Sequence, residues 1–174
     1  TWQYRTQMTA IPDISEFDEE ETSLWLGQMH SWTLLIRNLG NTYDGSTRMR
    51  ITADKNIPGM VVTAETSRGI SQLNGWVDLP MSPTASENVL VTFETLDSFP
   101  LGESVRLTLE VEGGRIGVDD ALQTVSTSIT VNVDQKRSIN VVWNLDSSIE
   151  FEPELLSTFH INVTTDSTMD ITLD

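Results

Sequence analysis

Acidic side chains crowd a short stretch near the start of the chain, where six carboxylates occupy nine consecutive positions. They are Asp13, Glu16, Asp18, Glu19, Glu20 and Glu21. Such a density of like charges favours a solvated loop. Calcium takes about six to eight oxygen ligands, so the same stretch is also a candidate calcium site, although its spacing does not match an EF-hand loop and it lacks the glycine that such a loop needs at its turn. A smaller set of the same kind is Asp44 with Asp119 and Asp120.

Five tryptophans invite a second interpretation, in which an exposed indole provides a platform for carbohydrate. Trp2, Trp32 and Trp143 fall on the inward faces of predicted strands, where aromatic rings are buried for their large area. Trp25 and Trp76 lie near predicted loops. These two are therefore the candidate ligand-binding residues, and carbohydrate is the candidate ligand.

The sequence offers little for catalysis. His30 and His160 sit at the start of a strand or on its predicted outer face, and no G-x-S-x-G or G-x-G-x-x-G motif or P-loop surrounds a candidate nucleophile or phosphate site. We therefore expect no enzymatic activity and no cofactor besides calcium. Asn162-Val163-Thr164 is an acceptor for N-glycosylation, relevant only if the chain is exported.

The strands that would position these residues are read from period-two alternation. Trp32, Leu34 and Ile36 alternate with more polar neighbours up to the run 38–41, Asn-Leu-Gly-Asn. Asparagine and glycine tolerate a positive φ, so this run is predicted to turn. Asn74-Gly75 between apolar flanks predicts a hairpin with a type I′ turn.

The same alternation predicts further strands at short spacing. They cover residues 2–10, 47–53, 60–62, 89–93, 105–111 and 129–133. No amphipathic period of about 3.6 residues persists over three turns. Short strands separated by Gly, Pro and Asn are typical of an all-β sandwich.

One stretch resembles a known family. L-W-L-G-Q-M-H-S-W-T-L-L-I-R-N-L-G-N-T-Y-D is similar to the opening of tandem immunoglobulin-like domains of archaeal and bacterial surface proteins, of the CARDB or NPCBM-associated type. The resemblance rests on Gly27, on Asn38, Gly40 and Asn41, and on residues 102–111 and 128–133, and covers about residues 20–134. It implies an immunoglobulin-like β-sandwich and a role as spacer, stalk or adhesion unit at the cell surface.

After residue 134 the pattern starts again. Alternation over residues 139–145, 159–163 and 169–173 repeats the order strand, acidic loop, strand, turn and strand. We therefore expect a sandwich over residues 1–134 and a partial second β module, or extra strands, over 135–174. These later strands could belong to a truncated repeat, pack on the first module, or be completed by another chain.

Composition limits the partners. The net charge is −16, from 26 acidic and 10 basic residues, which argues against nucleic acid and anionic membranes. There is no cysteine and no apolar run of about 20 residues for a membrane span. Because the sequence starts at Thr1, we expect any anchor to lie outside it. The sequence thus predicts a non-catalytic extracellular module that contacts neighbouring modules or subunits, with a carbohydrate-binding accessory domain as the alternative.

Overall fold

The structure is a computed structural model that describes residues 9–114 and 122–134 and the backbone of residues 139–143 and 161–165. The chain divides into two compact units, Thr1–Asp134 and Gln135–Asp174. All regular elements of the described residues are strands. The all-β prediction is therefore confirmed.

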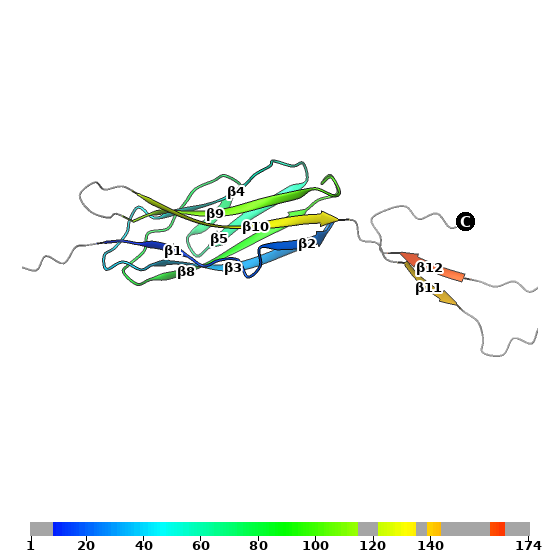
Figure 1. Cartoon of the computed structure of the whole chain (residues 1–174), viewed down its shortest axis with the longest axis horizontal. Helices are drawn as coiled ribbons and strands as arrows, with labels where there is room; N and C mark the ends of the chain where they lie inside the picture. The colour runs from blue at the N-terminus through cyan, green and yellow to red at the C-terminus, as the bar shows by residue number, and fades with distance from the viewer. Residues whose placement is uncertain (1–8, 115–121, 135–138, 144–160, 166–174) are drawn as a thin grey trace, which may run out of the picture. The chain divides into compact units, whose positions relative to one another are not determined.

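The first unit is a sandwich of two five-stranded sheets (Figure 1). One sheet has the order β1-β3-β8-β5-β6, with bounds Pro12–Ile14, Met29–Asn38, Ser86–Thr95, Met60–Thr66 and Gly69–Gln72. The other has the order β2-β10-β9-β4-β7, with bounds Glu21–Trp25, Gln123–Asp134, Ser104–Gly113, Arg48–Ala53 and Val77–Asp78. All pairings within these sheets are antiparallel except that of β2 with β10.

The core lies between the two sheets and follows the predicted alternation. Trp32, Leu34 and Ile36 of β3 are buried, as are their counterparts on β8. From the opposite sheet, residues 105, 107, 109 and 111 of β9 are fully buried. Each strand thus presents every second side chain to the core, which is the period that an antiparallel sheet imposes.

The acidic stretch after β1 is a crossing between the sheets. β1 pairs with β3, whereas β2, only seven positions after β1 in the sequence, pairs with β10 of the other sheet. Phe17 lies midway, buried with its ring edge-on to Trp32 at 5.8 Å between centroids. The solvated-loop alternative is therefore only partly right, because an aromatic anchor and the ends of two strands belong to the same stretch.

The predicted Asn74-Gly75 hairpin is wrong. The strands before and after it, β6 and β7, belong to different sheets. Asn74 has a φ of 66°, as a turn of that type requires, but Gly75 does not share the positive φ. Instead the Asn74 N–H donates to the Ile51 carbonyl at 2.8 Å, so the turn carries the chain across to β4. The hydrogen bond to Ile51, a residue distant in sequence, thus decides the conformation of this turn against its local hairpin propensity.

The run 38–41 does turn the chain, but for a different reason from the one predicted. None of its residues has a positive φ. The buried Asn38 side chain instead collects the loop backbone: its Oδ1 accepts from Ile11 and Gly40, and its Nδ2 donates to the carbonyls of Thr42, Met81 and Ser82. Gly40 is needed for closeness, because a Cβ there would lie 2.1 Å from the Thr9 carbonyl oxygen.

The second unit contains one described pair of strands, β11 (Ile139–Trp143) and β12 (Ile161–Thr165), which are antiparallel. Both fall where the sequence predicts strands. The predicted strands over residues 2–8 and 169–173 lie outside the described residues. Similarity of this unit to the first therefore stays a prediction.

Replacing Asn38 by Asp tests the loop assignment. Asn38→Asp keeps both accepted hydrogen bonds but turns an acid toward three carbonyl oxygens that had received a donor. We expect a loss of about 3 kcal/mol in the free energy of unfolding, measured by urea denaturation. Asn88→Asp, on an exposed position of β8, is the matched control and should change stability by less than about 0.5 kcal/mol. Equal effects would contradict the assignment.

Candidate functional site

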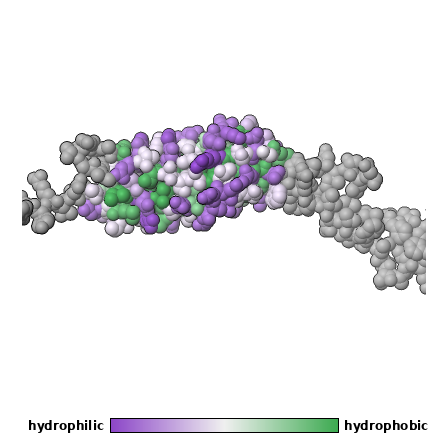
Figure 2. All heavy atoms as spheres, in the orientation of Figure 1, coloured by the Kyte–Doolittle hydropathy of each residue, from purple (hydrophilic) through white to green (hydrophobic). Residues whose placement is uncertain are grey.

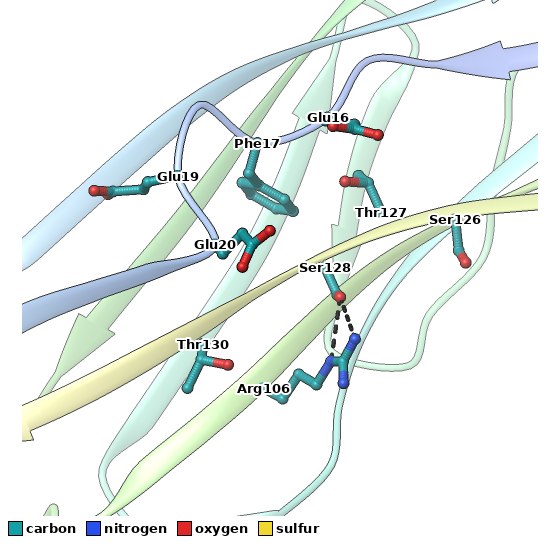
Figure 3. Close-up of a pocket in the computed structure, with 9 residues that line it drawn as sticks. All are labelled: Glu16, Phe17, Glu19, Glu20, Arg106, Ser126, Thr127, Ser128 and Thr130. Carbon is teal, nitrogen blue, oxygen red and sulfur yellow. Dashed lines mark hydrogen bonds between the residues drawn. The ribbon is translucent and has the colours of Figure 1, made fainter.

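An open groove of about 580 Å³ lies beside β10 in the first unit (Figure 3). Its walls come from the crossing segment between β1 and β2, from β10 and from β9. The lining residues are Glu16, Phe17, Glu19, Glu20, Arg106, Ser126, Thr127, Ser128 and Thr130.

The groove exists because β2 covers only half of β10. The parallel pairing runs from Thr130 opposite Glu21 to Asp134 opposite Trp25, and it begins with the Thr130 N–H donating to the Glu20 carbonyl at 2.9 Å. Residues 123–129 of β10 still pair with β9 on one side. On the other side no strand pairs with them, because β1, which precedes β2, pairs with β3 in the opposite sheet. Phe17 anchors this crossing in the core, which leaves the neighbouring glutamates at the rim.

The charges around the groove are unbalanced. Arg106 is the one cation among the lining residues, and it donates to the Ser128 hydroxyl through Nη2 at 2.7 Å and Nε at 3.1 Å (Figure 3, dashed lines). Within the described part of the chain, Glu16, Glu19 and Glu20 form no ion pair. The groove is thus a polar, hydroxyl-rich channel with a negative rim.

Nothing in the sequence analysis singled out this groove. Arg106 and the hydroxyls of β10 are far from the acidic stretch in sequence, and only the fold brings them together. One signal was available: residues 123–129, Q-T-V-S-T-S-I, carry no charge in an otherwise acidic chain. The sequence shows that this strand is uncharged, but only the sheet topology shows that β2 pairs with half of it.

The six carboxylates of the predicted calcium site are distributed rather than gathered. Asp13 forms an ion pair with Arg37 at 2.6 Å, and Glu21 accepts a hydrogen bond from Asn132 on β10. Among the described residues, no group of three or more His, Asp or Glu is placed to hold a metal ion. Asp119 and Asp120 lie outside those residues. Calcium binding stays a prediction.

The two candidate tryptophans differ in their surroundings. The Trp76 ring carries the guanidinium groups of Arg48 and Arg50, at 4.4 and 4.5 Å from its centroid. These arginines also pair with Glu112 and Glu110, so Trp76 belongs to a ladder on the outer face of the sheet. Trp25, at the end of β2, is 43% exposed. Carbohydrate binding therefore stays a prediction. Of the two candidates, Trp25 is the one whose ring is not covered by arginine side chains.

The remaining candidates from the sequence are the two histidines and the glycosylation acceptor Asn162. His30 begins the buried face of β3, half-buried, with its ring 4.7 Å from that of Trp32. His160 and Trp2 lie outside the described residues. Asn162 stands opposite Val142 in the β11–β12 pair, and its glycosylation stays a prediction. In the part of the chain that the structure describes, no helix is long and apolar enough to cross a membrane.

Asp44 has a structural role that the sequence did not reveal. The buried carboxylate accepts from the Ser46 hydroxyl at 2.6 Å, from the Ser46 N–H at 2.9 Å and from the Gly114 N–H, tying two loops at one end of the sandwich. Burial by itself raises the pKa of Asp44, but the hydrogen bonds from Ser46, Gly114 and Thr47 together hold it below its ordinary value of 3.8.

No family model and no curated protein matches the sequence. Solved structures do match. A variant of BcpA, the major pilin subunit of Bacillus cereus, has a TM-score of 0.50 at 10% identity, over 80% of this chain and 45% of the pilin. The major pilin GBS80 of Streptococcus agalactiae has a TM-score of 0.43 at 12% identity, over 73% and 56%. A PapD-like domain of human CEP192 has a TM-score of 0.41 at 11% identity, over 70% and 84%.

These likenesses bear on the fold. The two-sheet, all-β arrangement and the likeness to the BcpA pilin confirm the predicted immunoglobulin-like β-sandwich. At such low identity the likeness shows architecture and no more, because one sandwich fold carries many unrelated functions.

The pH dependence of stability tests the role of Asp44. Its pKa is lowered on folding, so its contribution is fully present above the unfolded value near 3.8 and is lost as the pH falls through the folded pKa. We expect Asp44→Asn to cost about 2 kcal/mol in the free energy of unfolding at pH 7. The difference between the two proteins should shrink below about pH 4, because Asp44 then becomes protonated. The other carboxylates titrate in both proteins and cancel in the comparison. A difference independent of pH would contradict this role.

Chelation tests the calcium prediction. Because two of the six carboxylates already have partners and the described residues place no group of three or more His, Asp or Glu to hold a metal ion, we expect EDTA to leave the thermal midpoint of the full chain unchanged. Calcium chloride is then added, and magnesium chloride at equal ionic strength controls for screening of the acidic surface. A rise in the midpoint with calcium but not with magnesium would support the predicted metal site.

Proposed function

We propose that the chain is a non-catalytic structural module, a stalk or spacer placed in series with other domains of an extracellular surface protein. The supporting observation is the position of the two ends of the first unit. Thr9 is bonded to Asn41 where β3 finishes, and Asp134 is bonded to Leu26 just before β3 starts. Since the ten residues of β3 span about 33 Å, the chain enters and leaves the sandwich at opposite ends.

The pairing of β2 with β10 suits such a module. Tension applied at residues 9 and 134 pulls β10 past its parallel neighbour along the strand direction, because the two strands are loaded from opposite ends. The hydrogen bonds between them are then sheared together instead of being opened one after another. Parallel pairing of β2 with β10, the last strand of the sandwich, is what makes this loading possible (Figure 1).

The distribution of exposed apolar side chains fits contacts in series. Leu39, Tyr43 and Leu122 lie at the end where the chain enters, with Tyr43 60% exposed. Trp25, Met29, Leu96 and Leu101 lie at the end where it leaves, with Met29 64% exposed. In Figure 2 the flank between is largely hydrophilic. Ile70, 56% exposed, and Leu90, 41% exposed, lie between the two ends on β6 and β8, so the exposed apolar side chains are concentrated at the ends but not confined to them. Their concentration at the ends favours neighbours along the axis.

The finer parts of the proposal rest on the sequence resemblance. The motif around Gly27, Asn38, Gly40 and Asn41 supports a CARDB-like or NPCBM-associated type of module, and tandem copies, adhesion and a microbial surface come with that type. Two of these glycines have structural reasons of their own: Gly27 has a φ of 79° and donates to Thr95, and Gly40 lies against Thr9. The net charge of −16 would keep parallel neighbours apart.

Force spectroscopy on the full chain tests the proposal. Since the sequence has no cysteine, Thr9→Cys and Asp134→Cys provide handles at the two ends of the first unit. The Leu26 N–H donates to Asp134, so by strand alternation the Thr22 N–H faces β10 and the Ser23 N–H faces away. We expect Thr22→Pro to lower the unfolding force, because proline removes one ladder hydrogen bond, which contributes roughly 1 kcal/mol.

Ser23→Pro is the matched control, because it removes an N–H that takes no part in the pairing. It should leave the unfolding force near that of the parent. Equal forces for the parent and both variants would show that the pairing of β2 with β10 bears no load, and the stalk proposal would lose its mechanical basis.

A further inference from the structure

The first half of β10 has a free edge. The Thr130 N–H points toward β2, so strand alternation directs the N–H and C=O groups of Thr124, Ser126 and Ser128 to the same side. Among the described residues no backbone group pairs with them, because β2 reaches back only to the Glu20 carbonyl. The edge over residues 123–129, about 23 Å of strand, therefore has unused donors and acceptors. Its later part, Ser126 to Ser128, lines the groove, and β1 of the opposite sheet lies in contact with β10.

This edge lacks the usual protection against pairing. Natural edge strands are blunted by charge, proline or shortness. β1 has Pro12 and the Asp13–Arg37 ion pair, and β7 has only two residues. The uncovered half of β10 instead carries hydroxyl and apolar side chains, with neither charge nor proline. Its side chains also favour the extended conformation, because Thr124, Val125, Thr127 and Ile129 are β-branched.

The rim of the groove adds a preference of charge. Elsewhere on the outer face of this sheet two carboxylates are neutralised, since Glu110 pairs with Arg50 and Glu112 with Arg48. The glutamates at positions 16, 19 and 20 have no such partner among the described residues, and Arg106 is turned to Ser128. The unpaired negative charge thus lies alongside the unpaired backbone.

We propose that the groove binds an extended peptide segment of another protein, which adds a strand to the edge of β10 at residues 124–128 and carries lysine or arginine at alternate positions toward Glu16, Glu19 and Glu20. Backbone hydrogen bonds supply the affinity, and the alternate basic side chains supply the selectivity. This interaction is separate from the stalk role, since it concerns the flank of the module and not its two ends.

A second copy of this chain is a poorer occupant. Pairing of two β10 edges would bring two sets of three unpaired glutamates together across the interface, in molecules that each carry a net charge of −16. Like charges brought together at an interface oppose association. A basic peptide meets the same surface with the opposite sign.

A synthetic peptide tests this directly on the full chain. The probe is acetyl-Thr-Lys-Val-Lys-Thr-Lys-Val-amide, followed by amide NMR shifts and hydrogen exchange at moderate salt. We expect saturable shifts centred on Thr124–Ser128 and slower exchange of the Ser126 and Ser128 amides. Two control peptides carry N-methyl groups on alternate backbone nitrogens, in the two possible phases. One phase should abolish binding and the other should preserve it, since only alternate amides of an added strand face β10.

Protein variants separate the edge from the charge. Ser126→Pro removes an outward N–H and should abolish binding. The triple variant Glu16→Gln, Glu19→Gln, Glu20→Gln should weaken it about tenfold. Its matched control, Glu65→Gln, Glu94→Gln, Asp97→Asn, removes the same charge from positions distant from the groove and should weaken it much less. The charge variants and the methylated peptides decide the matter even if Ser126→Pro does not fold.

Several results would overturn the proposal. Equal binding of both methylated peptides, or equal weakening by the two triple variants, would reduce it to attraction by an acidic surface. Shifts outside the edge of β10, or none at millimolar peptide, would contradict it outright. Sedimentation showing self-association that Ser126→Pro abolishes would assign the edge to a second copy instead. None of these results bears on the force measured between residues 9 and 134.

Discussion

The burial of Phe17 against Trp32 is the contact on which the arrangement of this sandwich depends. It fixes the point where the first strand leaves one sheet for the other, with the two rings edge-on at 5.8 Å. Before that point β1 pairs with β3, and after it β2 pairs with β10 in parallel. A single extended strand could cover one sheet edge completely. Divided into β1 and β2, it covers two edges in part, and both the parallel pairing of β2 with β10 and the unpaired half of β10 follow from that division.

Much of this fold could be predicted from the sequence, because the core obeys a local rule. Apolar residues dominate the inward positions of β3, β8, β9 and β10, and burial follows that alternation from Trp32 to Val133, with the half-buried Thr127 as an exception. The failures have the opposite origin. Asn74 donates to Ile51 across the sandwich, and Gly40 lies against Thr9, so both turns are decided by partners distant in sequence. Turn propensity describes a dipeptide, whereas these contacts belong to the whole sandwich.

The candidate site shows the same limit more sharply. The acidic stretch could be found at once, but what its carboxylates do depends on the element each one reaches. Asp13 meets Arg37 on a neighbouring strand, Glu21 meets Asn132 on the other sheet, and Glu16 remains at the rim of the groove. Arg106 and Ser128 join that groove only through the pairing of β9 with β10. A cluster in sequence was thus separated in space, while an unremarked uncharged strand became the more open surface.

The unpaired glutamates and the unprotected edge make better sense together than apart. An uncovered strand without charges of its own invites pairing with any extended chain, including another copy of itself. Carboxylates placed beside the edge, instead of on it, leave the backbone groups usable while repelling chains as acidic as this one. Such an arrangement discriminates by repulsion as much as by attraction, which is how a specific surface excludes its commonest competitor. In a protein built of repeated acidic modules, that competitor would be the module next to it.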